Sequence, residues 1–125
     1  MRTLTFVVAL ATLAFAWTAA AGDPDRPSPD RVKGMRAAVA DIERGVLRHR
    51  EFPLPDPAWF GDYTARLKKE CGVEWETVDP KAVPTGRAEL DGYNDVMRAE
   101  VERRHGPGVL DRLRQQVQDQ WEKRR

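Results

Sequence analysis

The sequence holds a single cysteine, Cys71, and an unpaired thiol can act as a nucleophile, as a redox group or in an intermolecular disulfide. A thiol becomes a nucleophile when a nearby cation or a helix N-terminus lowers its pKa. Cys71 is expected close to a helix C-terminus, with Glu70 and Glu74 beside it, which is the opposite environment. We therefore predict that Cys71 is buried, because a free cysteine packs as a small hydrophobe. An intermolecular disulfide and a reactive thiol are the alternatives for an odd cysteine in an exported chain.

The two histidines, His49 and His105, lie in the charged stretches LRHRE and ERRHG, which we interpret as solvated helix ends. A structural metal site usually needs four nitrogen or sulfur ligands, and these histidines with Cys71 make only three scattered ones. The phosphate-binding loops, the nucleophile elbow and the HExxH zinc pattern are all missing. We predict no catalytic, cofactor-binding or metal-binding residue, no cofactor and no enzymatic activity.

The segment DGYN contains the most unusual local pattern. Asn94 lies four residues after Leu90 and three before Met97, so a helix would place its amide on an apolar stripe. A buried asparagine is costly unless its amide finds partners, so Asn94 predicts a polar contact between helices or between subunits. The alternative is that the helix begins late, near Asp91. Gly92 lies on the opposite side and weakens the helix with no packing return visible in the sequence.

Four side chains are therefore candidates for an interaction surface or a cavity: Cys71, Trp75, Tyr93 and Asn94. A site would be indicated if Cys71, Tyr93 and Asn94 lined a common cavity. Trp59, Trp75 and Trp121 form an aromatic set that could anchor a protein partner, and packing in the core explains them equally well.

The elements that must position these side chains are predicted to be helices. Apolar residues at steps of three and four predict amphipathic helices over 30–49, 56–71 and 87–105, and a fourth from Pro107 to the C-terminus. In the first helix, Ser28 and Pro29 predict the cap and the first turn. Its apolar stripe consists of Val32, Met35, Val39, Ile42 and Val46.

The connections between these helices are short. Residues 51–57, EFPLPDP, predict a stiff strut, because each proline fixes its own φ and holds its predecessor extended. Val73–Val78 alternates and predicts one extended segment, which packs Trp75 on the helices or pairs with a second subunit. The predicted fold is all-α, a small bundle of about four amphipathic helices with this single extended segment.

Residues 1–21 predict a secretory signal peptide with a short basic start, an apolar run and small residues before Gly22. The alternative is an uncleaved anchor. Residues 22–29 predict a disordered, proline-rich leader, and 30–125 a single small helical domain. Without a second apolar run, we predict no stable membrane insertion after cleavage and a periplasmic or secreted location.

Composition narrows the possible partners. Cleavage removes Arg2 from the 21 basic residues and leaves 20 against 20 acidic ones, so a neutral chain has no bulk attraction to nucleic acid. We predict an exported, non-catalytic protein-interaction module, whose partner is another envelope or extracellular protein or a second copy of the chain. The alternatives are a thiol-dependent protein that uses Cys71, as a disulfide-linked dimer or a minor redox enzyme, and a binder of a small molecule or lipid in an interhelical cleft.

Overall fold

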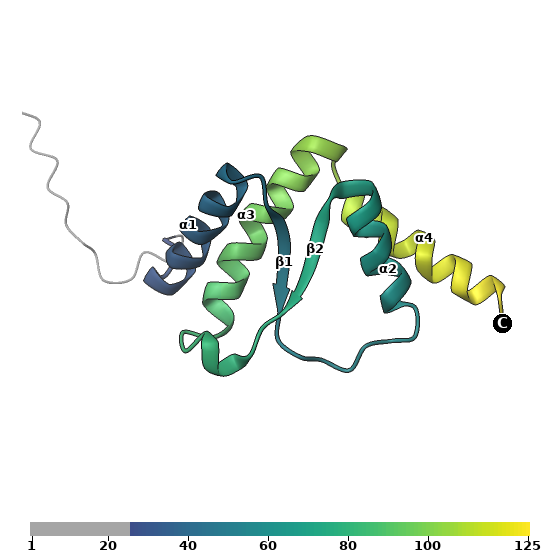
Figure 1. The fold of residues 1–125 in the computed structure, drawn as a ribbon, viewed down its shortest axis with the longest axis horizontal. Helices are drawn as coiled ribbons and strands as arrows, with labels where there is room; N and C mark the ends of the chain where they lie inside the picture. Colours follow the sequence, from purple (N-terminus) through teal and green to yellow (C-terminus); the bar gives the residue numbers. More distant parts are fainter. Residues whose placement is uncertain (1–25) are drawn as a thin grey trace, which may run out of the picture.

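The computed structural model describes residues 26–125, and the predicted signal peptide and most of the predicted leader lie outside them. Helices alternate with two strands along this part of the chain (Figure 1). In chain order the elements are α1 (Pro29–Glu43), β1 (Leu47–Glu51), α2 (Phe60–Arg66), the π-helical turn η1 (Leu67–Cys71), β2 (Val73–Thr77), the 3₁₀ turn η2 (Pro80–Ala82), α3 (Arg87–His105) and α4 (Val109–Lys123).

The prediction of an all-α bundle is wrong, because β1 and β2 form a two-stranded parallel sheet. Leu47 pairs with Val73 at one end and Glu51 with Thr77 at the other. The extended segment predicted at residues 73–78 therefore exists, but its partner lies inside the chain. Parallel strands need a crossover, and α2 with η1 supplies it.

Strand β1 replaces the last turns of the predicted first helix. Gly45 has a φ of +79° and follows directly on the last residues of α1. Such a glycine ends a helix at little steric cost, so the chain leaves α1 and turns into β1. His49 consequently lies in a strand and not at a helix end, and the residues that follow Glu51 run on as the proline-rich loop.

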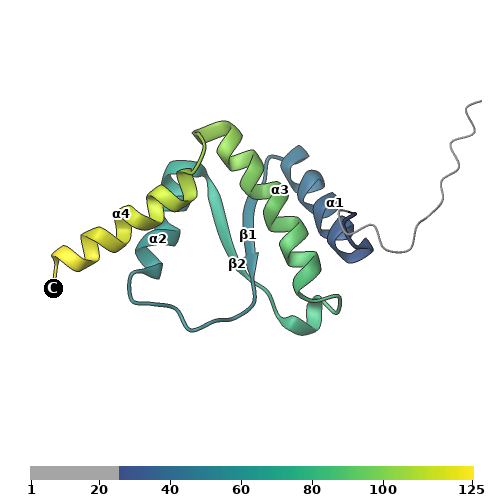
Figure 2. The ribbon, with the colours of Figure 1, turned by 180° about the vertical axis from the view of Figure 1, so that it is seen from behind.

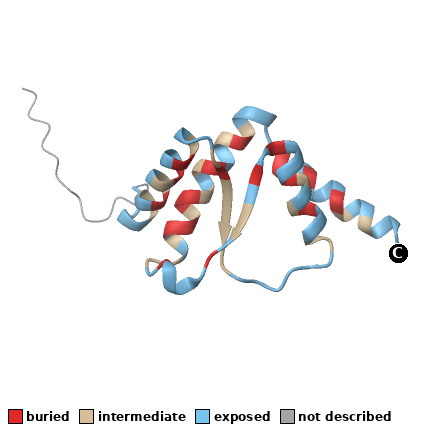
Figure 3. Cartoon of the chain, in the orientation of Figure 1, coloured by how far each residue is buried: buried red, intermediate tan, exposed pale blue. Residues whose placement is uncertain are grey.

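The elements surround the sheet on several sides (Figures 1 and 2). Helix α1 packs along α3, and α3 in turn packs along β1. Helices α2 and α4 lie together on the other side of the strands, beyond β2 in both views. Burial follows this arrangement: the inward faces of α3 and of η1 are buried, whereas the last turns of α4 are largely exposed (Figure 3).

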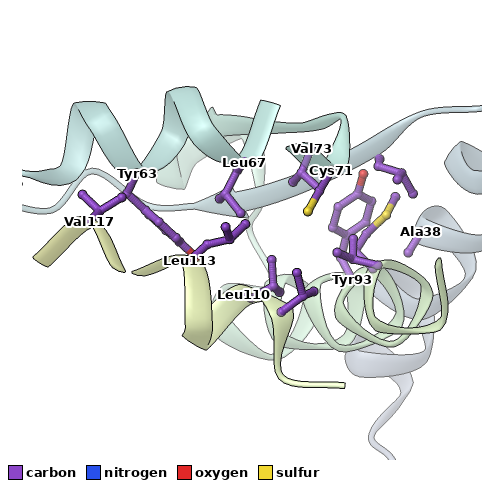
Figure 4. Packing of buried hydrophobic residues seen from close by; sticks show 13 residues of the cluster. Ala38, Tyr63, Leu67, Cys71, Val73, Tyr93, Leu110, Leu113 and Val117 are labelled. Carbon is purple, nitrogen blue, oxygen red and sulfur yellow. The ribbon is translucent and has the colours of Figure 1, made fainter. Parts of the chain in front are cut away.

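The main hydrophobic cluster draws on all the long elements (Figure 4). Tyr93, Met97 and Val101 enter it from α3, while Leu113 and Val117 enter it from α4. A smaller cluster of Val78, Val83 and Leu90 closes the region where β2 leads into α3. A chain that has few large aliphatic residues thus concentrates them between α2, α3 and α4.

Helix α1 buries a different face from the predicted stripe. Ser28 does cap it, accepting a hydrogen bond from the backbone N–H of Arg31 at 3.2 Å, as the sequence predicts. Its buried residues, however, are Gly34, Ala38 and Asp41, and Val39 is 46% exposed. Small residues face α3 because the two helices approach too closely for larger ones.

Two glycines allow that approach. A Cβ atom at Gly92 on α3 would overlap the carbonyl oxygen of Arg31, and one at Gly34 on α1 would overlap the carbonyl oxygen of Glu89. The backbones of α1 and α3 therefore meet at two points where only hydrogen fits. This corrects the expectation that Gly92 has no packing role: the helix gives up local stability at Gly92 and gains a close helix–helix contact.

Candidate functional site

Cys71 lies at the end of η1 in the main cluster and is 4% exposed. Desolvation, helped by the neighbouring Glu70 carboxylate, raises the pKa of the Cys71 thiol, which disfavours the thiolate. Gly72 follows with a φ of +67° and ends the helical turn, as the sequence predicts. The prediction that Cys71 is buried in packing is confirmed (Figure 4).

Tyr93 is fully buried on α3 and makes a polar contact with α1. Its hydroxyl donates a hydrogen bond to Oδ2 of Asp41 at 2.6 Å, and Arg44 donates to Oδ1 of the same carboxylate. Burial raises the pKa of Asp41, but the hydrogen bonds from Tyr93 and Arg44 outweigh it and hold the pKa below its ordinary value. The guanidinium of Arg50 lies over the Tyr93 ring, 5.1 Å from its centroid.

The side-chain amide of Asn94 forms hydrogen bonds with the backbone of β1, the strand next to its helix. Its Oδ1 accepts a hydrogen bond from the backbone N–H of Arg50 at 2.9 Å, and its Nδ2 donates to the backbone C=O of Arg50 at 2.7 Å. The side-chain amide thus binds β1 as a neighbouring strand would. The Asn94 amide does find polar partners, but the predicted location between helices or between subunits is wrong, because the contact joins α3 to a strand of the same chain.

Trp75 lies on β2 and stacks on His49 of β1, with the ring centroids 4.2 Å apart and the planes at 26°. Phe60 of α2 meets the same indole edge-on, with the centroids 4.8 Å apart. His49 is half-buried here, and burial lowers its pKa, so the neutral imidazole is favoured. The interpretation of His49 as a solvated helix end is wrong, whereas His105 does end α3 in solvent.

The candidate residues do not converge on one cavity. Trp75 borders a cavity between the sheet and α2, and Tyr93 borders a hollow of similar volume beside α1. Cys71 and Asn94 line neither of these two. Cys71, Tyr93 and Asn94 therefore serve packing and polar contacts in the interior, and of the four candidates Trp75 alone lines the cavity beside α2.

The cavity that Trp75 borders, which we call the aromatic cavity, encloses about 500 Å³ between the sheet, α2, α3 and α4. Its floor is the sheet face that carries His49 and Trp75, and residues 52–57 of the proline-rich loop form part of its wall. Three further rings from the start of α2 line it: Trp59, Phe60 and Tyr63. Trp59 meets Tyr63 edge to face, and Phe60 is tilted against both, so the wall is built before any ligand enters.

Cations from two other elements also border the cavity. Arg98 of α3 and Arg114 of α4 both line it and share one carboxylate, that of Asp111. The Arg114 guanidinium lies 2.8 Å from Asp111 Oδ1, whereas that of Arg98 lies 3.9 Å away. Both arginine side chains are about half exposed. Two positive charges against one negative leave this wall electropositive.

The acidic residues of the lining lie at the loop side. Glu51 is tied to Arg87, with 2.6 Å between Oε1 and Nη1, so its charge is already compensated. Asp56 lies on the exposed loop. The cavity therefore combines an aromatic floor with one positively charged wall, and this combination suits an apolar group that carries a negative end.

The sequence analysis did not identify this cavity. Its rings come from β2 and α2, its cations from α3 and α4, and the loop that covers it was predicted only as a strut. The density of aromatic residues between 59 and 63 was the available signal, and nothing in the sequence placed Arg98 near Arg114.

Within residues 26–125, no three His, Cys, Asp or Glu side chains are grouped so as to hold a metal ion. In the same part of the chain, none of the helices has the length and hydropathy that a membrane span needs. No protein-family model matches the sequence, and no curated protein or solved structure matches it. The functional argument therefore starts from the geometry of the site.

Proposed function

We propose that this chain is an exported, non-catalytic binding protein and that the aromatic cavity takes a small apolar carboxylate. The observation that carries the proposal is a preformed cavity of about 500 Å³ whose lining includes both a cluster of aromatic rings and the arginines at 98 and 114. Export rests on the sequence pattern of residues 1–21.

The size and lining of the cavity support a small-molecule ligand. Sites for such ligands typically enclose about 300–1,000 Å³ and combine apolar walls with a few polar groups that fix orientation. Trp59, Phe60 and Trp75 offer edges and faces to a flat ring or a short chain. Because its pKa is lowered, His49 is neutral near pH 7 and adds no charge to the floor.

The two arginines support the carboxylate. A guanidinium binds a carboxylate through two parallel N–H groups, and Asp111 occupies only part of what Arg98 and Arg114 offer. A ligand carboxylate could lie between them while its apolar body points toward Trp75. A neutral ligand of the same shape would lose this contact and bind more weakly.

Tryptophan fluorescence tests the proposal with two probes of one shape, 2-naphthoate and 2-naphthalenemethanol. We expect both to quench the cavity tryptophans in a saturable way and naphthoate to bind about tenfold more tightly, which corresponds to one charged hydrogen-bonded contact. Arg98→Gln with Arg114→Gln should remove this difference and leave the affinity for the alcohol unchanged. Arg112→Gln is the control, because Arg112 lies on α4 and does not line the cavity.

Two results would contradict the proposal. One is the absence of saturable quenching by either probe up to about 1 mM, the weakest affinity expected of a specific site. The other is an unchanged preference for naphthoate in the double variant, which would place the anion elsewhere.

The thiol-dependent alternative has less support. Cys71 lies in the main cluster and not in the aromatic cavity, and burial raises its pKa. Both features make the thiolate scarce and hard to reach. We expect Cys71 in the folded protein to react with a thiol reagent only after denaturant is added, and a disulfide-linked dimer band on a non-reducing gel would contradict this.

A further inference from the structure

The second strand has a free edge. Val78 N–H donates to Glu51 C=O at 2.8 Å, and this bond fixes which backbone groups of β2 point toward β1. In a parallel ladder these groups alternate, so those of Glu74 and Glu76 also face β1. The N–H and C=O groups of Trp75 and Thr77 then point away from it. Within residues 26–125, no hydrogen bond pairs these four groups.

The opposite edge of the sheet is covered at Arg50. Arg50 points its N–H and C=O away from β2, and the Asn94 amide binds both. An exposed strand edge is a template for another extended chain, and proteins usually cover it. The molecule covers the edge of β1 with a dedicated side chain and leaves the edge of β2 without one.

We propose that the free edge of β2 receives an extended polypeptide segment with basic side chains, added as a third strand. Main-chain hydrogen bonds to Trp75 and Thr77 would hold the segment, and alternate side chains would select it. The inference stands on the hydrogen bonding of the sheet and goes beyond the aromatic cavity, whose ligand is tested separately.

The charge of the partner follows from Glu74. Its side chain is exposed and makes no ion pair within residues 26–125. Glu76 is bound to Arg48, with 2.9 Å between Oε2 and Nη1, and lies 3.9 Å from Nε of Arg50. A lysine or arginine directly across from Glu74 would form a cross-strand pair of opposite charge, which favours pairing. Glu74 is therefore the carboxylate of the segment VEWET that is left without an ion pair along its edge.

The same glutamates argue against a second copy as the partner. Two β2 strands that pair antiparallel around Trp75 place Glu74 of each copy across from Glu76 of the other. Like charges across a strand pair are unfavourable, so pairing between the β2 edges of two copies is disfavoured. A basic segment would instead place a positive charge across from Glu74, which favours pairing.

The residues across from Trp75 are expected to be apolar. Side chains alternate between the two faces of a strand, so the neighbours of a lysine that lies opposite Glu74 emerge on the face of Trp75 and His49. That face is aromatic and half-buried. The proposed recognition pattern is thus basic and apolar residues in strict alternation.

Isothermal titration with blocked six-residue peptides tests the proposal on the purified protein. One peptide alternates lysine with valine, and its counterpart has glutamate in place of lysine. We expect the basic peptide to bind at least about tenfold more tightly than the acidic one, as a charged cross-strand pair implies. Glu74→Lys should reverse the preference, and Glu122→Lys, the same change at an exposed position on α4, should keep it.

N-methylated peptides test the edge itself. In an antiparallel third strand the valine N–H groups face β2 and the lysine N–H groups face away. Methyl groups on the valines should abolish binding, and methyl groups on the lysines should leave it within about twofold, because only the former remove a ladder hydrogen bond. Equal binding of the two methylated peptides, equal binding of the basic and acidic peptides, or no binding at all would overturn the proposal. So would a dimer of the protein alone that Glu74→Lys strengthens, because the new lysine would face Glu76 of the other copy.

Discussion

Tyr93 and Asp41 form a polar contact between α3 and the last turn of α1. Asp41 is a buried carboxylate, and such a group persists only when hydrogen bonds replace the water it loses. Tyr93 supplies one bond from the interior and Arg44 another from the surface. The pair therefore fixes how the two helices meet.

Tyr93→Phe should lower the free energy of unfolding by about 1–2 kcal/mol, because the Asp41 oxygen keeps its burial and loses its donor. Urea denaturation followed by circular dichroism measures the change. Tyr63→Phe is the matched control: Tyr63 is also a buried tyrosine of the main cluster, but its hydroxyl makes no hydrogen bond in the structure. If the two changes lowered the free energy of unfolding equally, the hydrogen bond from Tyr93 to Asp41 would not be the source of the effect.

His49 gives the protein a pH dependence of known sign. Burial lowers its pKa in the folded state below the ordinary value of 6.5, and the unfolded chain keeps that value. Between these two pKa values the unfolded state binds more protons, so the protein loses stability as the pH falls below about 6.5 and regains it above. Glu51 and the arginines at 87 and 98 are the charged groups that act on the ring.

His49→Phe should remove this contribution, because phenylalanine keeps the stacking on Trp75 and has no proton to bind. The free energy of unfolding at pH 5, 6 and 7.5 should then fall less toward acid than in the unchanged protein. His105→Gln serves as the control, since His105 is exposed at the end of α3. The assignment would be wrong if His105→Gln reduced the pH dependence of the free energy of unfolding and His49→Phe left it unchanged.

At the scale of elements, patterning predicted the helices well and the sheet poorly. Helix α3 has the predicted bounds 87–105, and β2 lies within the predicted extended segment, because both carry strong periodic patterns. Strand β1 reads LRHRE, with one apolar residue in five, and becomes a strand only through pairing with β2 and Asn94. Gly45 was the available sign that the first helix ends early.

The stripe of α1 was mispredicted for a related reason. A helix that crosses another at glycines buries its smallest residues, so Gly34 and Ala38 face inward while Val39 is half-exposed. Hydrophobic periodicity cannot identify such a face, because it weights large apolar side chains. The DGYN anomaly did lead to the right place: Gly92, Tyr93 and Asn94 each make a contact that defines where α3 lies.

Gly92→Ala and Gly61→Ala should have opposite effects. At Gly92 the new methyl group overlaps the Arg31 carbonyl of α1, so the helices must move apart at a cost of about 1–3 kcal/mol or more. At Gly61, within α2, nothing lies within 4 Å of the new atom, and alanine should stabilise the helix by about 0.5–1 kcal/mol. Thermal unfolding distinguishes the two, and a stabilised Gly92→Ala protein would refute the close crossing.

Asn94→Leu should lower the free energy of unfolding by about 1–3 kcal/mol, because it leaves the N–H and C=O of Arg50 unpaired against an apolar side chain. Asn94→Asp keeps the acceptor and loses the donor, so its effect at neutral pH should be intermediate. Denaturant titration of both variants provides the measurement. If leucine were as stable as asparagine, the amide would not be what closes the edge of β1.

At the scale of the whole molecule, α3 is the central element. It packs on α1, along β1 and against α4, and Tyr93, Met97 and Val101 are each at most 2% exposed. Helix α4 buries its first three turns and ends in exposed residues (Figure 3). Local stability should therefore decline from α3 toward the C-terminus.

Amide hydrogen exchange followed by NMR should show this gradient. We expect the amides of residues 93–101 to exchange only through global unfolding and those after Val117 to exchange by local fraying, at least about a hundredfold faster. Protection of residues 118–123 equal to that of α3 would contradict the gradient and indicate that α4 has a further partner.

The proline-rich loop, with Leu54 59% exposed, is the only covalent passage between the first two elements and the rest of the described chain. The glycine crossing, the Tyr93–Asp41 bond, the Asn94 amide and the β1–β2 ladder all tie those two elements to the other part without using it. A protease cut in the loop would therefore leave a nicked particle whose two pieces stay assembled. Made separately, the two pieces would be natural halves for a complementation reporter.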